Sequence, residues 1–98
     1  REQHQLQASK LKRKLAHYNI EMHPNASTHI VPVMVGDPVR CKKLSDVLLE
    51  EHGIYCQAIN YPTVAEGTER LRFAPTPLHT DAMISQLVDS LRKVLNEN

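Results

Sequence analysis

The stretch INYPTVAEGTERLRFAPTP, residues 59–77, decides the fold of this chain. It begins as the end of an apolar strand, breaks at Pro62, passes through Gly67 and resumes as the short strand RLRF, residues 70–73. Proline lacks a backbone donor, and glycine permits backbone angles that other residues resist. The interruption is therefore predicted to be a loop that connects two strands.

The side chains of RLRF divide between two faces. Alternate residues of a strand share a face, so Leu71 and Phe73 lie on one side and Arg70 and Arg72 on the other. We expect the apolar pair to face helices. An arginine held on a rigid strand suits a carboxylate, because its planar guanidinium makes two parallel charge-assisted hydrogen bonds. The pattern alone favours the simpler interpretation, in which both arginines are solvated or salt-bridged.

The rest of the chain is predicted to form three helices and two further strands. Apolar spacing predicts helices over residues 3–18, over 38–52 and after Thr80. Runs rich in β-branched residues predict strands over 29–36 and 54–59.

Short signals mark the ends of these elements. Asp37 and Pro38 suit the N-cap and first residue of a helix, and Gly53 suits its end. Thr80 suits the N-cap of the last helix. Pro32 lies inside the first strand and predicts an edge position or a bulge.

The order α-β-α-β-β-α predicts an α+β fold, a two-layer sandwich with helices on one face of a small, mostly antiparallel three-stranded sheet. The 98 residues form one domain. Their net charge of +1 indicates neither nucleic acid nor a membrane surface as partner. Cys41 and Cys56 are far apart in the sequence, which favours reduced thiols. The six histidines lack zinc-ligand spacing, so no metal site is expected.

The run HGIYCQAINYPTVAEGTERLRFAPTPLHT, residues 52–80, resembles the C-terminal domain of the 5-aminolevulinate synthases. These are α-oxoamine synthases within the fold-type I pyridoxal-phosphate (PLP) enzymes. The segment HIVPVMVGD and the helix through KKLSDVLLEEHGIY follow the same family in the same order, so the resemblance covers about residues 5–95. The pair Ala65-Glu66 departs from it, since the family usually has proline and a basic residue there.

The resemblance implies roles for individual residues. Arg72 falls where the family binds the carboxylate of glycine, and Thr63 where it contacts the succinyl group of succinyl-CoA. The segment from about Tyr55 to Arg72 matches a loop that closes over the active site, which includes Asn60, Tyr61, Pro62, Val64 and Gly67.

The resemblance also implies an activity for a longer protein, the PLP-dependent condensation of glycine with succinyl-CoA to 5-aminolevulinate, CoA and CO2, the first step of heme biosynthesis. PLP would act as the electron sink. No segment here resembles the family's Schiff-base lysine motif, so we expect a fragment that lacks the large PLP-binding domain and is inactive alone. The family works as a homodimer. A bacterial cytoplasmic enzyme fits better than a mitochondrial one.

Two alternatives remain open at this point. One is the corresponding domain of a sister α-oxoamine synthase, such as 2-amino-3-ketobutyrate CoA ligase. The other is a stand-alone module of ferredoxin-like shape, in which Arg70 and Arg72 bind an acidic ligand.

Overall fold

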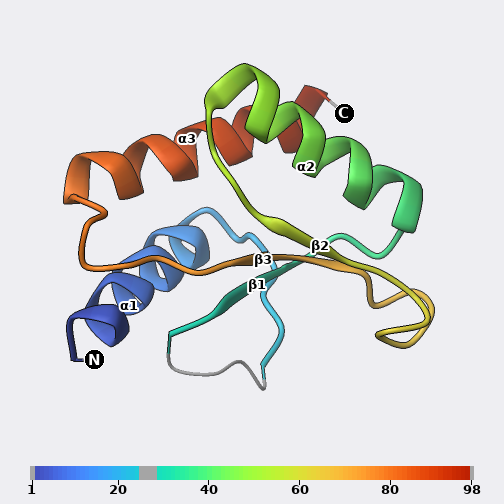
Figure 1. Ribbon diagram of the computed structural model, residues 1–98, viewed down its shortest axis with the longest axis horizontal. Coiled ribbons are helices and arrows are strands. Elements are labelled where there is room, and N and C mark those ends of the chain that lie inside the picture. The colour runs from blue at the N-terminus through green and yellow to red at the C-terminus, as the bar shows by residue number, and fades with distance from the viewer. Residues whose placement is uncertain (1, 25–28, 98) are drawn as a thin grey trace.

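The chain folds into two layers, a three-stranded antiparallel sheet and three helices. The computed structural model describes residues 2–24 and 29–97. Its elements follow the predicted order: α1 (Glu2–His17), β1 (Val31–Met34), α2 (Pro38–His52), β2 (Gln57–Ile59), β3 (Arg70–Phe73) and α3 (Asp81–Glu97) (Figure 1). The α+β prediction is confirmed.

β3 is the central strand of the sheet, although it is the last strand in the chain. It pairs antiparallel with β1, where Pro32 lies opposite Arg72, and with β2, where Gln57 lies opposite the same arginine. β1 and β2 are shorter than the predicted 29–36 and 54–59, because a strand extends only where a partner backbone is present and β3 has four residues. β1 is an outer strand, as Pro32 predicted.

The predicted helix ends of α2 are confirmed. The side chain of Asp37 accepts the Arg40 backbone N–H at 2.7 Å, and Pro38 occupies the first turn. Gly53 has a φ of 67°, and its N–H reaches the carbonyls of Leu48 and Leu49. Both caps satisfy backbone groups that the helix leaves unpaired.

Helix α3 begins as predicted, at a cap formed by Thr80. The Thr80 hydroxyl accepts the backbone N–H of Met83 at 3.2 Å. Asp81 follows in the first turn and accepts a hydrogen bond from Lys10 of α1 at 2.8 Å. This contact with Lys10 holds the pKa of Asp81 below its usual value and joins the two helices at one end.

Tyr18 lies just beyond the first helix, although the apolar spacing predicted that this helix would include it. The helix ends at His17, so Tyr18 leaves the helical spacing and is 41% exposed. Its ring instead receives the guanidinium of Arg92 from α3, 3.8 Å from the ring centroid. This cation–π contact lies at the surface.

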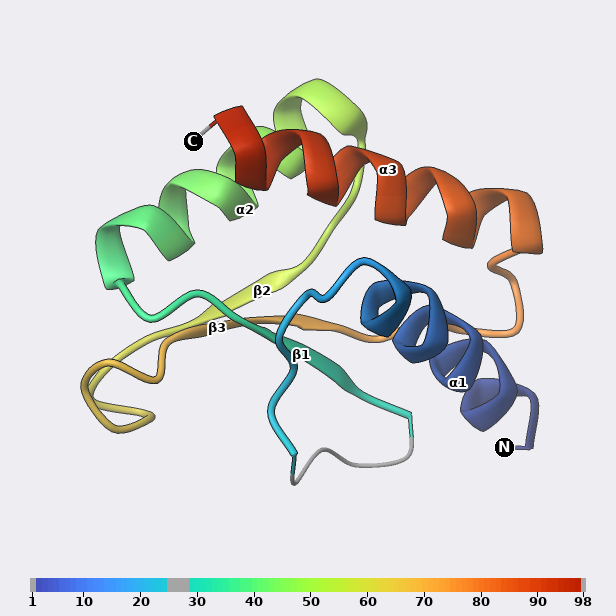
Figure 2. The same ribbon diagram turned by 180° about the vertical axis from the view of Figure 1, so that it is seen from behind.

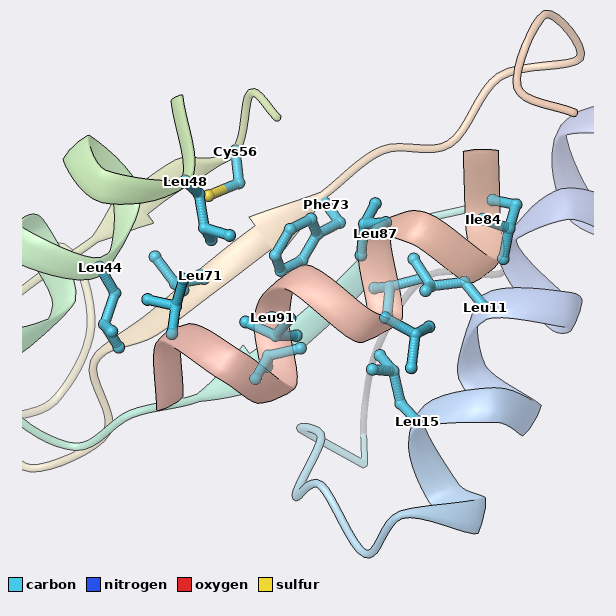
Figure 3. Close-up of a cluster of buried hydrophobic side chains, with 14 of the residues drawn as sticks. Leu11, Leu15, Leu44, Leu48, Cys56, Leu71, Phe73, Ile84, Leu87 and Leu91 are labelled. Atoms are coloured by element: carbon cyan, nitrogen blue, oxygen red, sulfur yellow. The ribbon is translucent and has the colours of Figure 1, made fainter. Parts of the chain in front are cut away.

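The hydrophobic core lies between the sheet and the helices. Leu71 and Phe73 project from β3 toward the Leu87 and Leu91 side chains of α3 (Figure 3). Viewed from behind, α2 and α3 run side by side across the sheet while α1 packs at its end (Figure 2). Further core residues come from α1 and α2: Leu11, Leu15, Leu44 and Leu48. In the described residues no helix is long and apolar enough to cross a membrane.

Replacement of a core leucine by alanine should separate core packing from surface effects. Leu91 is 0% exposed, so we expect Leu91→Ala to lower the free energy of unfolding by about 2–5 kcal/mol, through lost burial and the cavity left behind. Leu78 is 86% exposed and is the matched control, with an expected change below about 0.5 kcal/mol. Urea unfolding followed by circular dichroism measures both. Equal losses would contradict this placement of the core.

Candidate functional site

The two arginines of β3 lie on the face of the strand opposite Leu71 and Phe73, as predicted. Leu71 and Phe73 are buried, whereas Arg72 is exposed and Arg70 is half-buried. The guanidinium of Arg72 donates a hydrogen bond to Oε1 of Gln57, the residue opposite it on β2. Gln57 on β2 therefore orients the side chain of Arg72 on β3. Most N–H donors of the guanidinium stay available.

Arg72 lines a pocket of about 700 Å³. The pocket lies where β2 begins, β3 ends and α3 begins. Phe73, Leu87 and Met83 supply apolar surface, whereas Arg72 carries a positive charge that is permanent near neutral pH. An apolar pocket with a few convergent polar groups is the usual form of a small-molecule site. Its other polar or aromatic lining residues are His52, Tyr55, Gln57, His79 and Gln86.

His79 is one of two histidines that line this pocket, and its ring contacts the turn that precedes α3. Its Nδ1 accepts the backbone N–H of Thr76 at 2.8 Å. In neutral His79 the ring proton therefore sits on Nε2, which makes that atom a donor. The carbonyl of His79 accepts a hydrogen bond from the buried side chain of Gln7 on α1.

Arg70 has a different role from Arg72. Its Nε donates to the carbonyl of Thr68 at 2.9 Å, so the side chain folds back onto the chain that leads into β3. Arg70 therefore stabilises the end of the connection between β2 and β3. Neither arginine forms a salt bridge with a carboxylate among the residues that the structure describes.

The connection from residue 60 to residue 68, called here the 60–68 loop, consists of two successive turns. The Thr63 N–H donates to the carbonyl of Asn60 at 2.9 Å, and the Thr68 N–H donates to that of Ala65 at 3.0 Å. Gly67 takes a φ of 88°, which explains glycine at that position. The loop is thus a folded structure rather than an extended excursion.

The predicted loop residues and Arg72 lie in separate places in this chain. Thr63 is exposed on the 60–68 loop, which joins the end of β2 to the start of β3, whereas the pocket is lined by the start of β2 and the end of β3. The loop lies away from the start of α3 (Figure 1). The loop residues predicted by name do not line the pocket: Asn60, Tyr61, Pro62, Val64 and Gly67. Exposure varies along the loop: Tyr61 and Pro62 are exposed, Val64 is half-buried, and Asn60 has a buried carboxamide oxygen. Thr63 and Arg72 stay predicted substrate contacts.

Glu69 is a buried acid that the sequence reasoning missed. It is 0% exposed and directly precedes β3. A signal was available, because residues 69, 71 and 73 share one face of an extended chain and the other two are apolar. An acid at the first of these positions is directed toward the helix-covered side.

Both cysteines are buried and free, as expected. Burial raises the pKa of the Cys56 thiol to about 12. Burial also raises the pKa of Cys41, whose thiol donates to the carbonyl of Arg70 at 3.2 Å. These thiols are packing groups rather than nucleophiles. In the described ranges no three His, Cys, Asp or Glu side chains are grouped to hold a metal ion.

The sequence matches the aminotransferase class I and II family over residues 1–91. The chain belongs to this family. Within it, the chain is 50% identical over 94 residues to 5-aminolevulinate synthase of Rickettsia prowazekii, covering 96% of this chain and 22% of the relative. It is 55% identical over 91 residues to 5-aminolevulinate synthase 1 of Cereibacter sphaeroides, and the match covers 93% of this chain and 22% of that relative.

A fungal relative matches equally well over most of the chain. The mitochondrial 5-aminolevulinate synthase of Emericella nidulans is 50% identical over 93 residues, which cover 95% of this chain and 14% of that protein. The chain thus spans about a fifth or less of the length of these curated relatives.

Solved structures share the fold at low sequence identity. Serine palmitoyltransferase of Sphingomonas wittichii superposes with a TM-score of 0.81 at 21% identity, covering 96% of this chain and 24% of that one. 8-Amino-7-oxononanoate synthase of Francisella tularensis superposes with a TM-score of 0.79 at 20% identity, and the match covers 99% of this chain and 28% of that one. The two-layer fold therefore recurs as part of larger enzymes.

The raised thiol pKa values predict slow alkylation. In the folded chain we expect both cysteines to react with a thiol reagent at pH 8 far more slowly than after unfolding in urea, because burial suppresses the thiolate. After correction for the limited access of the reagent, the alkylation rate of Cys56 should still rise above about pH 10. The alkylation rate of a thiol of ordinary pKa no longer increases there. Labelling followed by mass spectrometry measures this. Fast labelling of the folded chain at pH 8 would contradict it.

Proposed function

We propose that this chain is the C-terminal domain of a 5-aminolevulinate synthase, in which it binds glycine and succinyl-CoA as part of a longer protein. The observation that carries the proposal is Arg72, oriented by Gln57 and lining the pocket, in a chain about 50% identical to enzymes of that name. A fixed arginine at a pocket suits a substrate whose recognised group is a carboxylate.

Arg72 binds and orients the amino acid in this proposal. Two parallel N–H···O bonds from a guanidinium fix a carboxylate in plane as well as in position. The contact to Gln57 limits the rotation of the Arg72 side chain before substrate arrives. The Arg72 side chain therefore loses less conformational entropy when substrate binds. The bound carboxylate holds the α-carbon of glycine in one orientation for reaction.

Thr63 provides the contact to the acyl substrate in this proposal. Its hydroxyl is exposed on the 60–68 loop and can donate to the distal carboxylate of a succinyl group. Because Thr63 and the Arg72 pocket are separated within this chain, the two substrates are brought together by movement of the loop or by the rest of the protein. Closure over the substrates would also exclude water.

The described residues of this chain do not by themselves fit PLP. No lysine lines the pocket, and the six lysines, Lys10, Lys12, Lys14, Lys42, Lys43 and Lys93, all lie in α1, α2 or α3. We therefore propose that PLP is held by the part of the longer protein outside this chain, and that this chain contributes substrate contacts. A homodimer remains part of the proposal.

The bacterial cytoplasm also remains our prediction for the location of the longer protein. Bacterial relatives and a fungal mitochondrial one match at similar identity, so the proposed activity is shared by both settings.

Removal of the Arg72 guanidinium should weaken glycine binding specifically. In the full-length enzyme we expect Arg72→Leu to raise the KM for glycine by about 10- to 150-fold, the equivalent of losing a charged hydrogen bond of about 1.5–3 kcal/mol. Arg92→Leu is the matched control, because Arg92 contacts Tyr18 on another surface and should leave the KM near wild type. Steady-state kinetics with varied glycine measures both. An unchanged glycine KM in Arg72→Leu would refute the assignment.

The 98-residue chain alone should not use PLP. Because no described lysine lines the pocket, we expect no saturable absorbance change on titration with PLP and no 5-aminolevulinate from glycine and succinyl-CoA. Absorbance titration and product detection measure these outcomes, with the full-length enzyme as positive control. Saturable binding of PLP with turnover by the 98 residues would contradict the prediction.

A sister α-oxoamine synthase is the second candidate, because 8-amino-7-oxononanoate synthase and serine palmitoyltransferase share the fold. Rates of the full-length enzyme with succinyl-CoA, acetyl-CoA and a long-chain acyl-CoA distinguish the candidates. The stand-alone binding module has less support, since the chain belongs to the aminotransferase class I and II family.

A further inference from the structure

Glu69 combines full burial with incomplete hydrogen bonding. One carboxylate oxygen, Oε1, accepts the backbone N–H of Gly67 at 3.1 Å. The other, Oε2, is buried and has no hydrogen-bond partner. Acids are almost never fully buried unless they are paired, because removal from water is costly. A carboxylate that is buried despite this desolvation cost, at the end of the 60–68 loop, indicates that Glu69 has a role in the structure of the loop.

The backbone of Glu69 connects the loop to the segment that follows β1, across the sheet from β2. Its carbonyl accepts two N–H groups, from Val35 and Gly36, both at 2.9 Å. Gly36 has a φ of 86°, and a Cβ there would lie 3.4 Å from the carbonyl oxygen of Gly67. The loop and the connection from β1 to α2 are therefore in close contact around Glu69.

Asn60, at the opposite end of the loop, presents a matching group. Ile59 pairs with Arg70 in the sheet, so continuation of the register places Asn60 opposite Glu69. Residues directly opposite in an antiparallel pair share a face. Asn60 Oδ1 is also buried without a partner. The two ends of the loop thus carry one unpartnered buried oxygen each, on the same side of the sheet.

Two acceptor oxygens stabilise each other only through a hydrogen atom placed between them. A single buried water is the smallest group that donates to both. Because both oxygens are inaccessible from outside, a group on another part of a longer protein cannot supply the donor without displacing the loop. The donor is therefore enclosed within this chain, between the two ends of the loop.

We propose that Glu69 is a positioning residue, which with Asn60 and a shared donor closes the base of the 60–68 loop and so places Thr63 for the acyl substrate. This rests on the proposed function, which supplies the acyl substrate. Glu69 itself touches neither substrate. Its effect reaches the reaction through the shape of the loop, and it should act on the acyl substrate more than on glycine, because Arg72 is held separately by Gln57.

The test exchanges the chemistry of the two side chains in the full-length enzyme. Glu69→Ala removes the acceptor for Gly67, and we expect the KM for succinyl-CoA to rise about tenfold while that for glycine stays within about twofold. Glu69→Gln keeps an acceptor and adds an N–H for Asn60, so it should behave close to wild type.

The reciprocal variant tests the pairing of the two positions. Asn60→Asp places two carboxylates together and should impair succinyl-CoA binding as much as Glu69→Ala does. The double variant Asn60→Asp with Glu69→Gln again supplies one donor and should restore it. Glu50→Gln, at an exposed acid of α2, is the control for loss of a charge and should have no effect.

Hydrogen exchange of the loop amides in the same proteins provides a readout that does not depend on turnover. Glu69→Ala and Asn60→Asp should speed exchange at residues 63–68, whereas Glu69→Gln and the double variant should not.

Unchanged exchange, an equal rise in both KM values, or failure of the double variant to restore succinyl-CoA binding would overturn the proposal. A wild-type enzyme that does not condense glycine with succinyl-CoA refutes the proposed function alone, and the exchange data then decide on Glu69. If Glu69→Ala does not fold, Asn60→Asp and the double variant decide the same question.

Discussion

Packing of Leu71 and Phe73 against α3 is the contact on which the other features depend (Figure 3). Because β3 is central, burial of these two side chains fixes which face of all three strands meets the helices. A shift of one residue in register would bury Arg70 and Arg72 instead, at a large cost in free energy. The position of Arg72 on the face opposite the core is thus a consequence of hydrophobic packing on the other side.

The same alternation divides the polar residues around the loop into different roles. Arg72 is exposed and held by Gln57, whereas Arg70 turns back to the carbonyl of Thr68. Glu69 lies one step earlier, on the buried face, and contacts Gly67. Three polar residues in β3 or directly before it therefore serve a pocket, a loop end and a buried contact.

Larger enzymes that share this fold provide the context for the pocket. It is lined by the start of β2, the end of β3 and the start of α3, and it holds an arginine but no lysine. The chain spans about a fifth of the length of its bacterial relatives. A pocket lined by an arginine that Gln57 orients supports the binding of a carboxylate in the proposed function.

The sequence by itself determined the element order, the caps of α2 and α3, the separation of the two faces of β3 and the resemblance to the family. These features depend on local spacing and on the chemistry of single residues, which can be read along the chain. The central place of β3, the partnership of Arg72 with Gln57 and the hydrogen bond from Gln7 to the carbonyl of His79 were decided only by the tertiary structure. Each needs two segments to meet in space, and side-chain spacing carries no information about which segments pair. Tyr18 shows the same limit, since its exposure depends on where the chain leaves α1 and on Arg92 of α3.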